Sequence, residues 1–262
     1  MENRIEKLFK AKKEKIVSVF FTAGYPKLND TLSIIKALDE AEVDMIEIGI
    51  PFSDPLADGK TIQESSSLAI KNGMTLAGLF EQLVSLRSIT DKPVLLMGYL
   101  NSVLQFGVNR FYEQCKKCGI DGVILPDLPI EEYEVEHKAL AESNHMIHVF
   151  LATPGTSANR IEKIKKVARG FVYMVSSNST TGNEFNDADA LKKIIPGFNF
   201  EIPVLIGFGI KSKKSFDSVC EIVNGAIIGS EYLRRISFCH DINKTTREFI
   251  NEIKYSHDYT VK

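Results

Sequence analysis

Strand-like and helix-like segments alternate along the whole chain of 262 residues, and this alternation restricts the possible folds more than any other feature. Several strand candidates are unbroken apolar runs, such as PVLLM at residues 93–97, GVIL at 122–125 and PVLI at 203–206. Such runs are typical of parallel strands that helices cover on both faces. Eight segments have strand character: residues 16–22, 45–48, 93–97, 122–125, 146–151, 171–175, 203–206 and 226–228.

Helical patterns fill the intervals between these strands. Leu76, Leu79, Phe80 and Leu83, for example, follow the i, i+3, i+4, i+7 spacing of a buried helix face. Other helices are predicted at residues 31–40, 109–117, 131–143, 159–168, 188–195, 214–223 and 244–253, with extra helices at the N-terminus, at 61–72 and near 231–236. Eight β/α units without a linker predict an α/β fold, one (β/α)8 TIM barrel in which residues 1–262 form a single domain. An open doubly wound sheet is the alternative, but no G-x-G-x-x-G turn follows the first strand.

Composition and charge exclude several classes of protein. The net charge is −2 with acids and bases interspersed, so the chain has no basic footprint for nucleic acid. No apolar run approaches the ~20 residues of a membrane span, and the charged start lacks the apolar core of a signal peptide. These features predict a cytoplasmic protein. The C-x-x-C pair Cys115 and Cys118 has no second Cys or His pair at close spacing, which favours a helix face over a metal site.

The segment MIEIGIPFSDPLADGKTIQ at residues 45–63 contains an acid, Glu47, in the middle of an apolar strand. A buried acid is costly unless it is paired or used. Period-2 alternation puts Met45, Glu47 and Gly49 on one face and the isoleucines on the other. If the isoleucines pack under helices, Glu47 points into the barrel, with Asp58 on the loop above it.

The two acids can divide the work of proton transfer. Apolar surroundings would raise the pKa of Glu47 towards neutrality, where a carboxyl group both gives and takes a proton. Asp58, in a wetter loop, would stay ionised and stabilise a positive centre. We interpret Asp54 as a turn or helix-cap residue. For Asp58, a turn role and a site role have equal support, because Asp-Gly is a strong turn dipeptide.

Two glycine-rich segments follow the seventh and eighth strands, IGFGI at residues 206–210 and GAIIGS at 225–230. In TIM barrels these two loops often bind phosphate through backbone N–H groups and the N-terminus of a short extra helix. Glycine lets the backbone approach the anion, and Ser230 can cap the helix and donate its hydroxyl. Two such segments at the two expected strand ends predict a phosphate site.

Several chemistries lack the residues that they need. No lysine lies in the strand cores for a Schiff base, and the five histidines show neither H-x-H nor H-E-x-x-H spacing for a metal. No G-x-S-x-G elbow is present. What remains is cofactor-free proton-transfer chemistry on a phosphorylated substrate, by an isomerase or a lyase.

The segment EIGIPFSDPLADGKTIQ, which begins at Glu47, closely resembles the signature of the tryptophan synthase alpha chain family. Other motifs of the family follow in the same order along nearly the whole sequence: FFTAGYP at 20–26, LLMGYLN at 95–101, GIDGVILPDLPIEE at 119–132, PVLIGFGI at 203–210 and NGAIIGS at 224–230.

This resemblance implies a lyase that cleaves indole-3-glycerol phosphate to indole and glyceraldehyde 3-phosphate in a retro-aldol step, with no cofactor in this chain. It implies a beta-chain partner that carries pyridoxal phosphate, in an α2β2 complex. It also implies three groups of site residues: Glu47, Asp58 and Tyr173 for catalysis; Phe20, Thr22, Tyr99, Asp127 and Thr181 around the indole pocket; and Gly182, Gly207, Phe208, Gly209, Gly229 and Ser230 for phosphate.

The sequence departs from the family pattern in its loops. Lys60 stands where the family usually has proline, and Ser177–Gly182 reads SNSTTG where the usual ending is GVTG. Lysine removes the constraint on φ and puts a cation near Asp58.

Two other functions stay open: a lyase that works without a partner, and a non-catalytic subunit that binds a phosphate ligand and activates its partner.

Overall fold

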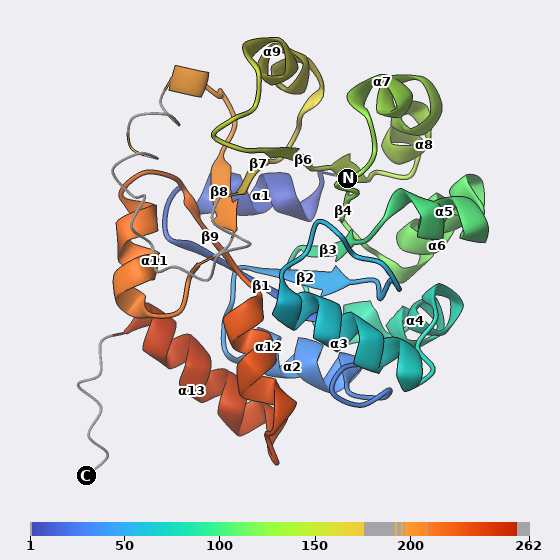
Figure 1. Ribbon diagram of the computed structural model, residues 1–262, viewed down its shortest axis with the longest axis vertical. Helices are drawn as coiled ribbons and strands as arrows, with labels where there is room; N and C mark the ends of the chain where they lie inside the picture. Colours follow the sequence, from blue (N-terminus) through green and yellow to red (C-terminus); the bar gives the residue numbers. More distant parts are fainter. Residues whose placement is uncertain (1, 176–191, 193–194, 196, 208, 256–262) are drawn as a thin grey trace.

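The computed structural model describes residues 2–175, 192, 195, 197–207 and 209–255, which form a ring of parallel strands surrounded by helices (Figure 1). Nine strands pair in the order β5-β4-β3-β2-β1-β9-β8-β7-β6. Their bounds are β1 Ile16–Thr22, β2 Met45–Gly49, β3 Val94–Met97, β4 Gly122–Ile124, β5 Ile147–His148, β6 Phe150–Ala152, β7 Val172–Val175, β8 Val204–Gly207 and β9 Gly225–Ile228.

The two edges of this sheet, β5 and β6, are separated only by Val149. β5 pairs with β4 and β6 pairs with β7, so the predicted fifth strand is present but changes its partner half-way. The barrel is therefore nearly closed, and the predicted TIM barrel is confirmed with its fifth strand in two pieces. No helix among the described residues is long and apolar enough to cross a membrane.

The helices lie outside the strands (Figure 1). Their bounds are α1 Arg4–Ala11, α2 Thr31–Glu40, α3 Lys60–Lys71, α4 Leu76–Leu83, α5 Leu100–Phe106, α6 Val108–Cys118, α7 Ile130–Glu132, α8 Lys138–Ser143, α9 Ala158–Val167, α11 Lys213–Cys220, α12 Ser230–Ser237 and α13 Ile242–Lys254, with a π-helical turn at Tyr133–His137 and a 3-10 turn at Leu86–Ser88. The predicted helix at 188–195 falls mostly outside the described residues.

α5 is a helix that the sequence did not predict. Its first backbone N–H, at Leu100, donates to both carboxylate oxygens of Asp127, at 2.9 and 3.1 Å. Asp127 follows β4, so a residue 27 positions away stabilises the start of this helix. No local N-cap signal marks the start of α5, because Tyr99 at the cap position makes no side-chain capping bond.

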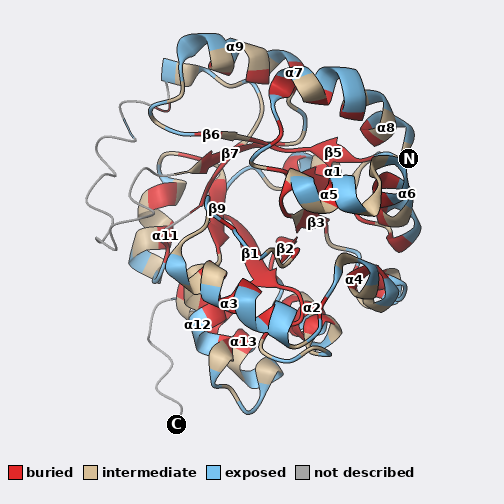
Figure 2. Ribbon diagram, turned by 45° about the vertical axis from the view of Figure 1, so that its right-hand side comes forward, coloured by how far each residue is buried: buried red, intermediate tan, exposed pale blue. Residues whose placement is uncertain are grey.

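The strands are buried and the outer faces of the helices are exposed (Figure 2). All five residues of β2 are buried, Glu47 among them. Gly49 lies under the ring of Phe20, since a Cβ at Gly49 would come within 2.5 Å of the Phe20 ring. Phe20 and Glu47 are paired in register across β1 and β2. The floor of the barrel mouth is therefore built from these two neighbouring strands.

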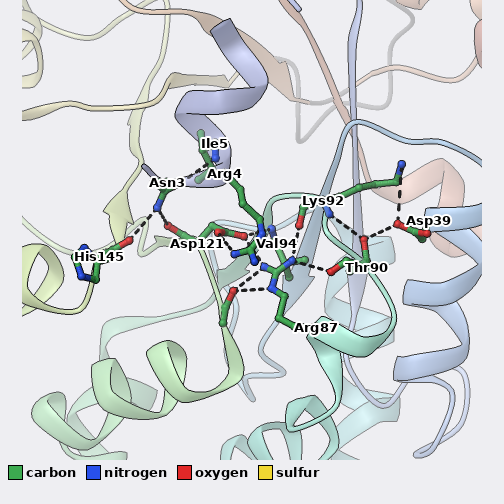
Figure 3. A network of polar contacts seen from close by, with 11 residues as sticks. Asn3, Arg4, Ile5, Asp39, Arg87, Thr90, Lys92, Val94, Asp121 and His145 are labelled. Carbon is green, nitrogen blue, oxygen red and sulfur yellow. Dashed lines mark hydrogen bonds and ion pairs between the residues drawn. The ribbon is translucent and has the colours of Figure 1, made fainter. Parts of the chain in front are cut away.

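The opposite end of the barrel is held by a buried ionic network (Figure 3). Asp121, which immediately precedes β4 and is 4% exposed, accepts bonds from Arg87 at 2.5 Å, Arg4 at 3.1 Å and the Val94 backbone at 2.9 Å. Arg87 also donates to the carbonyl oxygens of Gly119, Thr90 and Lys92. The network ties the start of α1 to the beginnings of β3 and β4.

Candidate active site

Glu47 is enclosed at the mouth of the barrel. Its side chain is fully buried, and the Ser18 hydroxyl on β1 donates to Oε1 at 2.9 Å. No described residue bonds to Oε2. Burial raises the pKa of Glu47 to about 7, and the bond from Ser18 opposes this rise. A carboxyl group with this pKa is present in both protonation states near neutral pH.

Asp58 lies on the loop between β2 and α3 and is half-buried. The Tyr99 hydroxyl donates to Oδ2 at 3.0 Å and accepts from the Ala57 N–H at 3.1 Å, while the Phe52 ring stacks on Tyr99. Burial raises the pKa of Asp58 to about 6, opposed by the Tyr99 bond. Asp58 is therefore less exposed to water than expected, and its pKa is raised in the same direction and for the same main cause as that of Glu47.

Tyr173 on β7 completes the group. Its ring stands against Gly207 on β8, where a Cβ would lie 2.2 Å from the phenol, so only glycine fits there. Burial, and then the charges of Glu47 and Asp58, raise the pKa of Tyr173 well above its usual range. The phenol therefore stays protonated. Tyr173 and Asp58 line one pocket together with Phe20, the register neighbour of Glu47, whereas Glu47 itself is not among the lining residues.

A pocket connects this region to the glycine-rich loops. Its lining includes six of the predicted site residues, Phe20, Asp58, Tyr173, Gly209, Gly229 and Ser230, together with three charged residues that the sequence did not single out, Lys211, Glu231 and Arg234. The lining is completed by apolar side chains such as Ile62, Met97 and Ile227. The pocket thus has an acidic and aromatic end and a glycine-rich end.

The glycine-rich end offers backbone donors at the start of α12. Gly229 is the N-cap residue and makes no side-chain capping bond, so the expectation that Ser230 caps the helix is wrong: the helix begins at Ser230 itself. The Gly229 carbonyl accepts from the Leu233 N–H at 2.9 Å. The N–H groups of Ser230, Glu231 and Tyr232 precede that bond and are available to an anion. Gly209, with φ +80°, is in the left-handed region.

Several predicted residues lie elsewhere or cannot be placed. The Thr22 hydroxyl bonds to Ser65 on α3 at 2.6 Å, and exposed Asp127 binds the start of α5, so neither lines the pocket. Tyr99 acts on the site only through Asp58 and its loop. Three further residues, Thr181, Gly182 and Phe208, lie outside the described residues.

The side chains of Cys115 and Cys118 are buried on α6, and Cys118 donates to the Phe80 carbonyl. Among the described residues, no three His, Cys, Asp or Glu side chains are placed to hold a metal ion.

Comparison with known proteins identifies the family of the chain. A sequence model described as "Tryptophan synthase alpha chain" matches residues 6–260. The chain belongs to the tryptophan synthase alpha chain family. The alpha chain of Flavobacterium johnsoniae is 46% identical over 255 residues, with 96% of this chain and 100% of that protein covered. The alpha chain of Bacteroides thetaiotaomicron is 43% identical over the same length and shares of coverage.

Solved structures of the family have the same fold. The alpha subunit from Legionella pneumophila is 30% identical with a TM-score of 0.88 and 97% of each chain covered. A chain of the tryptophan synthase complex from Pyrococcus furiosus is 33% identical with a TM-score of 0.83, covering 92% of this chain and 98% of that one. As a tryptophan synthase alpha chain, the protein is a lyase of tryptophan biosynthesis that cleaves indole-3-glycerol phosphate to indole and glyceraldehyde 3-phosphate.

Lys60, the departure from the family pattern, is the first residue of α3. Its ammonium group lies 3.8 Å from Glu64 and its side chain is 89% exposed, so it pairs along the helix and not with Asp58. Gly59 at the N-cap is extended, with φ −72° and ψ 162°, a conformation that a following proline accepts. The first helical position is also where proline is favoured.

We therefore expect Lys60→Pro to slow amide hydrogen exchange in residues 54–63 and to stabilise the protein by about 0.4–1 kcal/mol, because proline restricts the unfolded chain. Lys60→Ala is the control, since it removes the cation without fixing φ. Equal exchange in all three proteins would refute the idea that Lys60 loosens this loop.

Proposed function

We propose that Glu47 is the general acid and base of the cleavage. The protonated carboxyl donates its proton to the indole ring carbon that carries the side chain. The resulting carboxylate then removes the proton of the side-chain hydroxyl, the carbon–carbon bond breaks, and the aldehyde forms as indole leaves. The proton that Glu47 gives is replaced by the one that it takes, so no other acid is needed. The pKa of about 7 carries this assignment, because it makes both steps accessible at neutral pH.

Asp58 and Tyr173 support this step in different ways. Protonation of the ring carbon puts positive charge on the ring nitrogen, and the Asp58 carboxylate, held by Tyr99, can accept the ring N–H and stabilise that charge. Tyr173 is protonated and close to both acids, so its hydroxyl can donate to the substrate oxygen. The apolar pocket wall at Phe20 and Ile62 suits the indole ring.

The glycine-rich end is the proposed phosphate site, with Gly209, Gly229 and Ser230 in the pocket lining and with Gly182, Gly207 and Phe208 as further candidates from the family pattern. We also propose that residues 1–262 act as a single domain in the cytoplasm and that the chain needs no cofactor of its own. The partner is a tryptophan synthase beta chain in an α2β2 complex, and pyridoxal phosphate belongs to that chain.

Indole release from indole-3-glycerol phosphate tests this proposal, measured with the purified chain alone and with a beta chain. We expect slow release that the partner accelerates. Fast release without the partner would favour a lyase that works alone. Activation of the partner's reaction without any indole release would favour a non-catalytic subunit.

A further inference from the structure

Besides Asp58, three charged side chains line the pocket that contains Gly209, Gly229 and Ser230. Lys211 follows β8, while Glu231 is in the first turn and Arg234 in the last turn of α12. The backbone donors alone can bind a phosphate of any substrate, but these side chains set the charge that an entering phosphate group meets.

Glu231 by itself would repel a phosphate dianion. Its side chain is only 15% exposed, and it is the acid in the first turn of α12. Two arginines offset its charge: Arg234 forms an ion pair with Oε2, and Arg235 lies 3.2 Å from Oε1. Arg235 also forms an ion pair with Glu252 at 2.7 Å, and Glu252 does not line the pocket, so Arg235 neutralises Glu231 only in part.

Lys211 adds a second cation to the lining of the same pocket. The side chain is exposed, and no ion pair within the described part of the chain involves its ammonium group. The neighbouring Lys213 is paired with Asp217 at 2.5 Å. The phosphate end therefore has two cations, Lys211 and Arg234, against the single carboxylate of Glu231.

We propose that Lys211 and Arg234 recognise the phosphate of the substrate as charged groups, in addition to the backbone donors, and that they select a phosphomonoester dianion over a neutral group. The inference rests on the proposed function, since the ligand is the phosphate-bearing half of its substrate. Charge-assisted bonds to phosphate are about twice as strong as neutral ones. Arg234 contributes more to phosphate binding than Lys211, because its loss also leaves the negative charge of Glu231 less neutralised beside the phosphate.

The test compares Lys211→Met and Arg234→Met with the matched control Lys214→Met in the full chain. Lys214 lies three residues after Lys211 and, like Lys211, lines a hollow beside α11, but only Lys211 also lines the pocket with the glycine-rich loops. The probe is glycerol 3-phosphate, a stable analogue of the phosphate-bearing half, titrated calorimetrically at low ionic strength where screening is weak. KM and kcat for indole-3-glycerol phosphate are measured with a beta chain.

We expect Lys211→Met and Arg234→Met each to weaken glycerol 3-phosphate binding and raise KM by about tenfold, with kcat and the control within about twofold of wild type. If Arg234→Met folds poorly, the double variant Glu231→Gln/Arg234→Met removes the acid together with its partner. This double variant should regain part of the affinity for glycerol 3-phosphate that Arg234→Met loses. Affinities and KM values equal to those of Lys214→Met would overturn the inference. Absence of indole release by wild type would instead refute the proposed function, and the calorimetric comparison would still decide the role of the two cations.

Discussion

Glu47→Gln is expected to lower indole release by about 10³-fold while the affinity for indole-3-glycerol phosphate stays within a few-fold of wild type. The amide keeps the volume of the carboxyl and can still bond to Ser18, but it neither gives nor takes a proton at neutral pH. The Glu47 side chain is fully buried, so bulk water does not contact the position from which a base must act. Single-turnover indole formation, with binding followed by calorimetry, measures both quantities.

Glu113→Gln is the matched control for this variant. Glu113 lies on the exposed face of α6, far from the proposed chemistry, so the same substitution there should leave the rate unchanged. Substantial indole release by Glu47→Gln, at a tenth of the wild-type rate or more, would remove Glu47 from the mechanism.

The same variant should be more stable than wild type at alkaline pH. The folded pKa of Glu47, about 7, is above the unfolded value of 4.5, so the folded state binds more protons between these values. The free energy of unfolding of wild type therefore falls as the pH rises through this window. Glu47→Gln lacks this fall. Its free energy of unfolding should therefore exceed that of wild type by little at pH 4.5 and by an amount of the order of 3 kcal/mol at pH 8. Denaturant unfolding of both proteins over this range measures it, and a constant difference would contradict the linkage.

Asp121→Ala is expected to reduce the free energy of unfolding by about 3–5 kcal/mol and to lower Tm by about 10 °C. The substitution leaves the guanidinium groups of Arg87 and Arg4 without their carboxylate and the Val94 N–H without its acceptor (Figure 3). Arg87 is only 20% exposed, so water cannot fully replace the lost partner. Denaturant unfolding followed by circular dichroism measures the loss.

Two variants give this prediction its controls. Asp91→Ala changes an exposed acid on the same end of the barrel and should alter stability by no more than about 0.5 kcal/mol. Asp121→Asn keeps an acceptor for the Val94 N–H, so its free energy of unfolding should lie between those of wild type and Asp121→Ala. Because the network is at the end of the barrel away from the site, the folded fraction of Asp121→Ala should keep its kcat. A loss below about 1 kcal/mol would mean that the network does not hold the barrel together.

The fold was largely predictable because burial on both faces gives each parallel strand an unbroken apolar run. β1 begins and ends at the predicted residues, and the acid within β2 stood out against its isoleucines. The start of α5 was not predictable, since Asp127 reaches it from another β/α unit. The division of the fifth strand into β5 and β6 likewise depends on two different neighbours, which the strand's own residues do not encode.

A residue of the candidate site was predictable from the sequence only where the neighbouring residues that indicate its role lie in the same segment. Glu47 and Asp58 share a segment, and Gly229 and Ser230 share a strand exit. Lys211 and Arg234 have no periodic or motif signal, and they meet only because β8 and β9 end side by side. Thr22 and Asp127 remain predictions from the family pattern for the indole pocket; in the structure they bond to Ser65 and to the start of α5.

We propose that Glu47 serves as both acid and base because enclosure in the barrel raises its pKa to about 7. The most direct measurement is a 13C NMR titration of protein labelled at the glutamate side-chain carboxyl carbons, with the Glu47 signal assigned by its absence in Glu47→Gln. We expect a midpoint at about pH 7. A midpoint near the ordinary value of 4.5 would contradict the account, because Glu47 would then be ionised throughout the neutral range and could not supply the proton.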